Sequence, residues 1–347
     1  TKRDGNYVWS EQAAGVGHYA KYADKRLSES DTENLLVQLA MENSARTGKP
    51  IDKRAIDNVA QEIQQNVDTQ EARRVYDSPS KGVLWGWEVP AYVWTKAIAT
   101  GTFLMMAVWH FFNGGLESSS EMAGLITTLV FMGLTGGLLV KDIDRPDRFL
   151  YVLLRPQWKS WLVRGAYIIT GFGGFVSLKL LDNYLQLGLD WLWIPGLVFA
   201  GLGAVYTAFL FNQARARDLW QTPIQSAIHM LVHAIMAGSV VMMIIAPESS
   251  QWMANILLWG IVANVVIMAK EILLPHDTPD TKKAIHLMTK GYYSKYFWVG
   301  IVMGSLIPIV VLNAFSSMSL IAGGLALVGI YLTEFVRIRV PQMISLS

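Results

Sequence analysis

The stretch GLITTLVFMGLTGGLLVK, residues 124–141, carries no charged side chain before its final lysine. A bilayer core about 30 Å thick requires roughly 20 apolar residues in a helix, because hydrocarbon offers no water to exposed backbone groups. The stretch therefore predicts a membrane-spanning helix. It is followed by DIDRPDRF, residues 142–149, with five charged side chains, and then by a second apolar run, WLVRGAYIITGFGGFV, residues 161–176.

The same test of length and apolarity, applied outward in both directions, finds eight segments. They lie at about 91–112, 121–141, 162–182, 192–211, 225–246, 252–272, 297–316 and 318–338. The chain has 52% hydrophobic residues and a mean hydropathy of +0.31, and it is richer in apolar side chains than an ordinary soluble domain. We predict an all-α fold: a polytopic membrane bundle of about eight transmembrane helices, preceded by a short helical soluble N-terminal extension.

The first part of the chain differs in composition from the rest. We divide the sequence into a soluble N-terminal extension, residues 1–85, and a transmembrane domain, residues 86–347. Within the extension, SDTENLLVQLAMENSARTG at 30–48 predicts a capped amphipathic helix, and residues 53–65 predict a second one. Two short helices bury little core. The extension is therefore either an arm that orders against a partner or a tail without fixed structure.

The chain contains no cysteine, which excludes disulfides and thiolate-bound zinc or iron–sulfur centres. His229 and His233 stand four residues apart on one predicted helix, whereas a bis-imidazole haem needs ligands on facing helices at similar depth. We expect no haem, no iron–sulfur cluster and no metal in this chain. If electrons move here, another subunit or a diffusible carrier holds them. We see no cleavable secretory signal at the start of the sequence.

Eight spans place both termini on one face of the membrane, which we call the N-side. The short N-side connections carry an excess of lysine and arginine, and the opposite connections are mostly acidic. The positive-inside rule then predicts that the N-side is cytoplasmic. We expect a multi-pass protein of the inner (cytoplasmic) membrane with both termini in the cytoplasm.

Charged and polar residues inside the spans are costly in lipid and are therefore candidates for a functional site. Eight of them fall in the N-side half of the bilayer at 1.5 Å per residue: Lys96, Asp142, Arg164, His229, His233, Lys270, Glu271 and Glu334. In the opposite half, His110 and Lys179 lie close enough to the interface to snorkel into water. The clustering predicts a polar pocket that opens toward the N-side. For Lys270, Glu271 and Glu334, simple solvation at the interface is the alternative.

The segment DIDRPDRFLYVLLRPQWKSWLVRGAYI, residues 142–168, resembles the connection between helices 2 and 3 in the NrfD family. This family comprises membrane subunits of polysulfide reductase, alternative complex III and related molybdenum or iron–sulfur oxidoreductases. The matching positions are Asp142, Arg145, Pro146, Arg148, Phe149, Pro156, Ser160 and Gly165. RARDLWQTPIQSAIHMLVHAIMAG, residues 215–238, is similar to the family's entry into helix 5. The resemblance covers the chain from about Gly82 onward.

The resemblance implies a quinone/quinol site at the N-side end of the bundle. The ligand would be menaquinone or ubiquinone, beside a ferredoxin-like iron–sulfur subunit and a molybdopterin-type catalytic subunit. Asp142 is our candidate for the proton-exchanging carboxylate, and His233 is the second catalytic candidate. The expected quinone-binding residues are Tyr92, Lys96, Asp142, Arg145, Arg148, Arg164, His229 and His233. Many members of the family face a periplasmic partner from this end, but the charges here place it in the cytoplasm.

Three functions remain open from the sequence. The first is the quinone-reactive subunit of a multi-subunit respiratory oxidoreductase, not catalytic alone, which exchanges electrons between an iron–sulfur subunit and the quinone pool. The second is a proton- or ion-translocating subunit, with a relay through Lys96, His233, Lys270, Glu271 and Glu334. The third is a structural membrane anchor. A nearly bare opposite half disfavours the relay, and buried Lys96 and Arg164 disfavour a plain anchor. Nothing in the sequence indicates a nucleic-acid partner.

Overall fold

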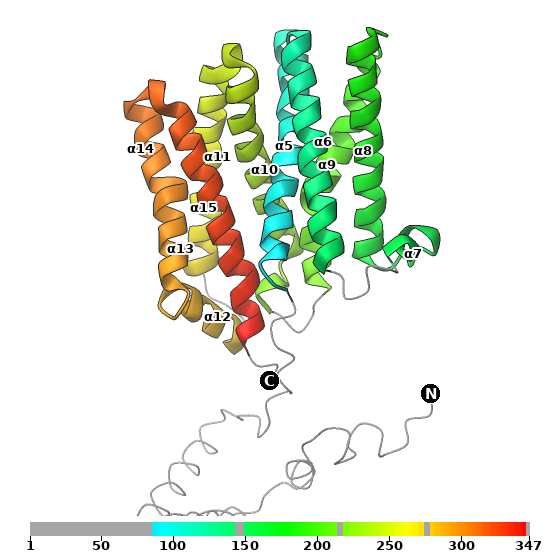
Figure 1. The fold of residues 1–347 in the computed structure, drawn as a ribbon. Coiled ribbons are helices and arrows are strands. Elements are labelled where there is room, and N and C mark those ends of the chain that lie inside the picture. Colours follow the sequence, from blue (N-terminus) through cyan, green and yellow to red (C-terminus); the bar gives the residue numbers. More distant parts are fainter. Residues whose placement is uncertain (1–84, 143–148, 214–217, 274–277, 345–347) are drawn as a thin grey trace, which may run out of the picture. The chain divides into compact units, whose positions relative to one another are not determined.

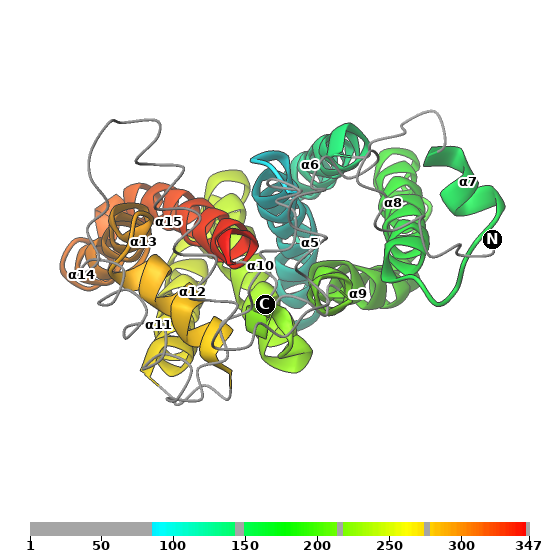
Figure 2. The same ribbon diagram turned by 90° about the horizontal axis from the view of Figure 1, so that it is seen from below.

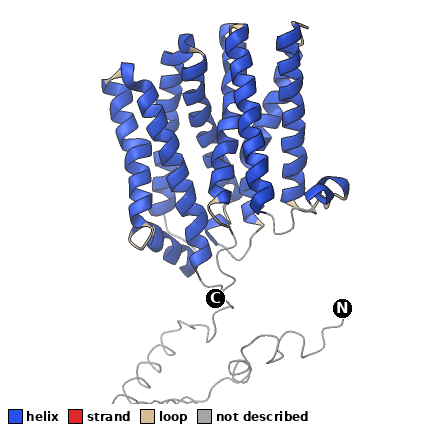
Figure 3. Ribbon diagram, in the orientation of Figure 1, coloured by secondary structure: helices blue, strands red, loops and turns tan. Residues whose placement is uncertain are grey.

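A computed structural model describes residues 85–142, 149–213, 218–273 and 278–344. The regular structure of these residues is helical, without a strand (Figure 3). Eight of the helices are long and apolar enough to cross a membrane, which confirms the predicted polytopic bundle. All of the extension, residues 1–85, except Trp85 lies outside the described residues, so its two predicted helices remain predictions.

The spans follow one another up and down through the bundle (Figure 1). Their bounds are α5 Glu88–Asn113, α6 Ser118–Asp142, α8 Trp161–Leu185, α9 Trp193–Asn212, α10 Pro223–Ile245, α11 Ser250–Leu273, the composite α13 Ser294–Ile301 with α14 Ile307–Ala314, and α15 Ser319–Arg339. The start of α5 and the end of α15 lie at the same face, the N-side. Each observed span overlaps the segment expected from the sequence.

Helix α5 lies near the centre of the bundle. Its side chains are buried almost without interruption from Val89 to Ala107, and it packs against α6, α9, α10 and α15. A helix that is apolar all round belongs in the interior. Seen along the bundle, α5 and α10 separate a group of α6, α8 and α9 from a group of α11, α13, α14 and α15 (Figure 2). Residues on α5 and α10 can therefore meet side chains from both groups.

Two glycines allow α5 and α10 to touch along their backbones. A Cβ atom at Gly101 would overlap the Ala234 carbonyl group, and one at Gly238 would overlap the Gly101 carbonyl group. In lipid, helices are not driven together by the hydrophobic effect. Small residues at such crossings allow close van der Waals contact between the helices, which stabilises their association instead. This crossing fixes α10, and with it both histidines, against α5.

The seventh span contains a wide π-helical turn, Val302–Leu306, between α13 and α14. Pro308 stands just after this turn and has no N–H with which to continue the regular hydrogen-bond ladder. Gly304 in the turn meets Gly329 of α15 so closely that a side chain at either position would overlap the other. The wide turn accommodates the proline while α13 and α14 remain packed against α15.

Two shorter helices on the N-side were not anticipated, α7 at Phe149–Leu154 and α12 at Pro279–Thr289. The Thr278 hydroxyl caps α12 by accepting a hydrogen bond from the Thr281 N–H at 3.2 Å. Helix α12 buries Ala284, Ile285 and Met288 against the N-side end of the bundle. Both helices are too short for the length test that found the spans.

Candidate functional site

Two histidines of α10 form the centre of a buried polar group. His229 and His233 are one helical turn apart, and their ring centroids lie 4.2 Å from each other. His229 is fully buried, His233 is 2% exposed, and Glu334 from α15 is 1% exposed. Buried polar groups require partners, because their desolvation is otherwise uncompensated. We call His229, His233, Asn264, Glu271, Glu334 and Arg337 the N-side cluster.

Asn264 connects the two histidines from α11. Its Oδ1 atom lies 2.6 Å from His229 Nε2 and 3.0 Å from His233 Nε2. Asn264 is 4% exposed, so water does not compete for these hydrogen bonds. One amide oxygen therefore receives hydrogen bonds from both rings.

Arg337 joins the cluster from the last turn of α15. Its guanidinium group donates to His229 Nδ1 at 2.6 Å and to Glu334 Oε1 at 3.2 Å. A second nitrogen lies 3.1 Å from Glu271 Oε2 on α11. One cation thus stands between two buried carboxylates and a neutral ring nitrogen, which is a demanding arrangement to hold in a low-dielectric interior.

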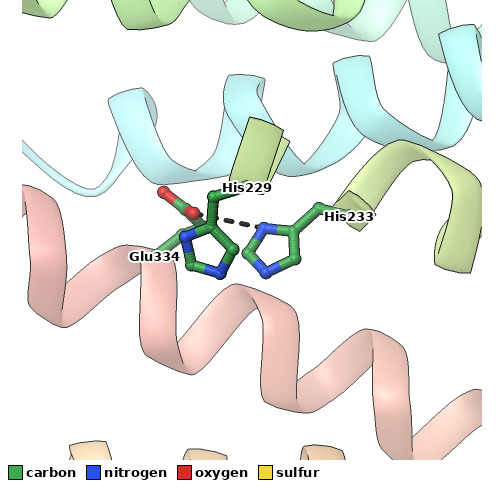
Figure 4. A group of neighbouring side chains, drawn as sticks. All are labelled: His229, His233 and Glu334. Atoms are coloured by element: carbon green, nitrogen blue, oxygen red, sulfur yellow. Dashed lines mark ion pairs between the residues drawn. The ribbon is translucent and has the colours of Figure 1, made fainter. Parts of the chain in front are cut away.

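Glu334 also faces His233. The distance from Glu334 Oε1 to His233 Nδ1 is 3.2 Å, and both side chains are 2% exposed (Figure 4). The picture shows the carboxylate reaching from α15 toward the two rings on α10. The cluster thus links α10, α11 and α15 at a depth of roughly 15 Å from the N-side end of α10, counted over the ten residues from Pro223 to His233.

Lys96 brings α5 to the same region. It is 3% exposed, and its amino group donates to the Ala204 carbonyl at 3.0 Å and to Thr207 Oγ1 at 2.5 Å. The same nitrogen lies 4.6 Å from the ring centroid of Tyr206 and interacts electrostatically with Glu334. Lys96 therefore connects the α9 wall of the site to the N-side cluster.

Tyr92 continues this arrangement toward the N-side surface. It stands one turn before Lys96 on α5, is 2% exposed, and interacts electrostatically with Tyr206 and with Asp142. Asp142 is the last residue of α6 and is half-buried. The series Asp142, Tyr92, Lys96 and Glu334, in which Tyr206 is the common neighbour of Tyr92 and Lys96, thus runs from the membrane interface to the cluster.

Two small cavities border these residues. One of about 10 Å³ is lined by Lys96, His233 and Met230 together with apolar residues of α5, α9 and α15. The other, also about 10 Å³, is lined by Glu334, Arg337 and Met230 together with the aromatic side chains of Phe211 and Trp220. A cavity of this volume has room for about one water molecule. Met230 forms a wall of both.

His229, His233 and Glu334 also have the spacing of a metal-ligand set, with ligand atoms within 4.8 Å of one another. Arg337, however, donates to His229 Nδ1 and to Glu334 Oε1, so two lone pairs that a metal would use are already occupied by N–H groups. A guanidinium group at this position also repels a second cation. The donor set therefore suits a proton better than a metal ion.

The family model described as Polysulphide reductase, NrfD, matches residues 77–344. The chain belongs to the NrfD family. The resemblance drawn from 142–168 and 215–238 is thereby confirmed. No curated protein sequence matches the chain.

NrfD proteins are membrane subunits of quinone-linked oxidoreductase complexes, and in general they partner iron–sulfur and molybdopterin subunits. Their association with quinone fits the expected ligand class. The present NrfD subunit is accordingly a multi-pass membrane protein of an electron-transport system.

The structure of this NrfD subunit brings together five of the expected quinone-site residues: Tyr92, Lys96, Asp142, His229 and His233. Arg145 and Arg148 lie outside the described residues. Glu271 and Glu334, for which solvation at the interface was the alternative, are 7% and 1% exposed. Lys270 is exposed, which agrees with that alternative.

The expectation that Arg164 is a buried pocket residue is wrong. Its side chain is exposed on α8, donates to the Trp158 carbonyl at 2.7 Å and stacks over the Trp161 ring. Depth along a span can be counted from sequence, but the face that a helix turns toward the bundle depends on its neighbours. Arg164 belongs to the outer N-side rim of α8.

The expectation that Lys179 snorkels into water is also wrong. Lys179 is 3% exposed, and its amino group lies 2.7 Å from Asp182, 3.4 Å from Glu121 and 3.4 Å from Asp190. These carboxylates come from α6, α8 and the turn before α9. The half of the membrane opposite the N-side is therefore not bare; it contains a buried lysine whose ion pairs, two of them with buried carboxylates, tie three segments together.

Sequence reasoning missed Asn264 and Arg337 as members of the site. Asn264 is an uncharged residue in the middle of an apolar span, so a search for charged groups and histidines does not find it. A buried amide nevertheless needs hydrogen-bond partners there. From sequence, Arg337 is one of the N-side lysines and arginines whose excess predicts the orientation. Its spacing of three residues from Glu334 on one helix was the available signal, because such pairs share a face.

Proposed function

We propose that this NrfD subunit binds quinone or quinol at the N-side end of its bundle and exchanges electrons between an adjacent iron–sulfur subunit and the membrane quinone pool. Family membership supports the general role. The observation that carries the specific proposal is the convergence of Lys96, His233 and Glu334 on one pair of cavities inside a membrane bundle. Quinone chemistry needs donors for carbonyl oxygens and a supply of protons, and these residues offer both.

A quinone ring requires more room than the two cavities provide, because ligand pockets typically measure about 300–1,000 Å³. Met230 is the wall that both cavities share. Methionine has a flexible, unbranched side chain that changes rotamer readily. Rotation of Met230 would join the cavities into an apolar space with Lys96 and His233 on one side and Phe211 and Trp220 on the other.

In this proposal Lys96 and His233 donate to the quinone carbonyl oxygens. Asp142 exchanges protons with the N-side and Tyr92 connects it to the site. Arg145 and Arg148 follow Asp142 in the sequence and are proposed to position it or to hold its charge. The extension, residues 1–85, is proposed to dock a partner subunit on the same face.

The proposal is tested by Lys96→Met in the assembled complex. We expect the KM for quinone to rise and quinone-linked turnover to fall about 10- to 100-fold, because a buried hydrogen-bond donor to the ring is lost. Lys179→Met is the matched control, since it removes a second buried lysine, at the opposite end of the bundle. Turnover per assembled complex should stay near normal in the control. Equal turnover in both variants would contradict the proposal.

A translocating function is the second candidate, and the buried Lys179 group is the observation that favours it. Between the two ion groups, the hydroxyls of Thr100, Thr102 and Ser239 donate to carbonyls of their own helices, so they are already engaged. The same Lys179→Met variant separates the functions. Normal quinone turnover with lost proton release on the far side would support translocation.

Orientation in the membrane is a separate proposal: the N-side is cytoplasmic. Reporter fusions after Gly114 and after Pro275 should report opposite sides, because α6 to α11 lie between these positions. We expect the Pro275 fusion to be cytoplasmic, as the positive-inside rule requires. A periplasmic reporter after Pro275 would reverse the orientation and place the partner subunits in the periplasm.

A further inference from the structure

The hydrogen bonds of Arg337 fix the protonation of His229. A guanidinium group has N–H donors and no acceptor. Because it donates to His229 Nδ1 at 2.6 Å, that nitrogen must present a lone pair. A neutral imidazole carries its proton on the other nitrogen, so His229 Nε2 bears a hydrogen and donates to Asn264 at 2.6 Å.

The protonation of His233 at Nε2 follows from the same chain of contacts. Asn264 must present its oxygen, since a reversed amide would point an NH₂ group at the Nε2–H of His229. An amide oxygen only accepts, and His233 Nε2 lies 3.0 Å from it. His233 Nε2 therefore also carries a hydrogen. The contacts of Arg337 and Asn264 thus determine three of the four ring nitrogens.

The fourth nitrogen, His233 Nδ1, lies 3.2 Å from Glu334 Oε1. If His233 were neutral and Glu334 ionised, two lone pairs would face each other in a buried site. One proton between them removes this conflict, either on the imidazolium or on the carboxylic acid. We propose that His233 and Glu334 share one proton and deliver it to bound quinone, with Asn264 and Arg337 as the residues that position it; this inference rests on the proposed function.

Charged and titratable groups from every neighbouring helix bear on this pair. They are Lys96 on α5, Tyr206 on α9, His229 on α10, Glu271 on α11 and Arg337 on α15. Arg337 is balanced by Glu271, and the shared proton balances Glu334. The charges of Glu271, Arg337 and the protonated His233–Glu334 pair therefore sum to zero, which lowers the cost of burying the cluster.

Quinone takes up two electrons and two protons to become quinol, and the electrons come from the iron–sulfur subunit. In one of the two proton transfers, the bond between the proton and the His233–Glu334 pair breaks and an O–H bond forms on the quinone. The other proton is taken up from the N-side through Asp142. The pair is left with facing lone pairs and is reprotonated from the N-side through the series that begins at Asp142.

The experiment compares Asn264→Asp with Asn264→Leu in the assembled complex and measures quinone-linked turnover against pH. Asp keeps an acceptor for both rings and adds a negative charge, so the pair should hold its proton to higher pH. The pH above which quinone-linked turnover declines, the alkaline limit, should move up by about one pH unit or more. Leu removes the acceptor, so His233 can turn its only proton to Nδ1 and release the extra one. The alkaline limit should then move down.

Asn255→Asp is the matched control, because it makes the same change on an exposed part of α11. It should leave the profile unchanged. A purely structural role for Asn264 predicts less assembled complex and no shift in either variant, and that result would overturn the proposal. Stoichiometric metal in the wild-type complex that is lost in His233→Gln would overturn it as well.

A measurement on the unmodified protein covers the case in which neither Asn264 variant assembles. Quinone-linked turnover of the wild-type complex is compared in H₂O and D₂O. We expect slower turnover in D₂O because proton delivery contributes to the rate. Equal rates in the two solvents, at saturating electron donor, would contradict delivery from the pair.

Discussion

Arg337→Met should greatly reduce the amount of assembled subunit in the membrane. The substitution leaves Glu271 and Glu334 buried at 7% and 1% exposure without their common cation. Removing one partner of a buried ion pair typically costs about 3–5 kcal/mol, because the remaining charge has neither water nor a counter-ion. That cost is a large part of the stability of an ordinary domain.

The measurement is the yield of subunit in purified complex together with its thermal unfolding in detergent. Arg339→Met is the control, since Arg339 stands two residues away and contacts the Tyr293 hydroxyl at 3.4 Å. We expect the control to assemble normally. Adding Glu271→Gln to Arg337→Met should recover part of the yield, because one of the two unpaired charges is then neutral. Full assembly of Arg337→Met alone would show that the ion group does not hold α11 against α15.

The spans of the fold were predictable because each one satisfies a strong local condition. A helix in hydrocarbon needs length and apolarity, and both can be counted along the chain. The wide turn at Val302–Leu306 was not predictable in the same way, because it depends both on Pro308 and on the contact between Gly304 and Gly329. That contact joins two helices, and the sequence alone does not show that these two glycines lie against each other.

The residues of the candidate site also fall into those that a local condition predicts and those that depend on tertiary packing. Lys96, His229, His233 and Glu334 were found because polar groups in lipid are costly wherever they point. Arg164 and Lys179 were misplaced because their environment depends on other helices: Arg164 faces outward from α8, and Lys179 meets carboxylates from three segments. The sequence therefore predicts how deep in the bilayer a charged residue lies, whereas its contact partners depend on tertiary packing.

Asp142→Asn should abolish most quinone-linked turnover while the complex stays assembled. Asp142 ends α6 at the N-side interface, is half-buried, and interacts with Tyr92 at the start of the series that leads to Lys96 and Glu334. The amide keeps the size of the side chain but cannot take up and release a proton. General acid–base groups typically contribute about 10²- to 10⁴-fold, and we expect a loss in that range.

The competing explanation is that Asp142 braces the connection between α6 and α8, in which case the variant would lose the assembled complex instead. Quinone-dependent activity and subunit stoichiometry measured on one preparation separate these outcomes. Electron transfer from the donor to the iron–sulfur partner should survive in the catalytic case.

Glu88→Gln provides the matched control, because Glu88 is a carboxylate at the same face whose partner, Lys141 at 3.2 Å, has a 56% exposed side chain. Such solvent-screened pairs contribute little, so this variant should keep near-normal turnover. Normal turnover in fully assembled Asp142→Asn would reject the proton-exchanging role, and the His233–Glu334 pair would then need another connection to the N-side.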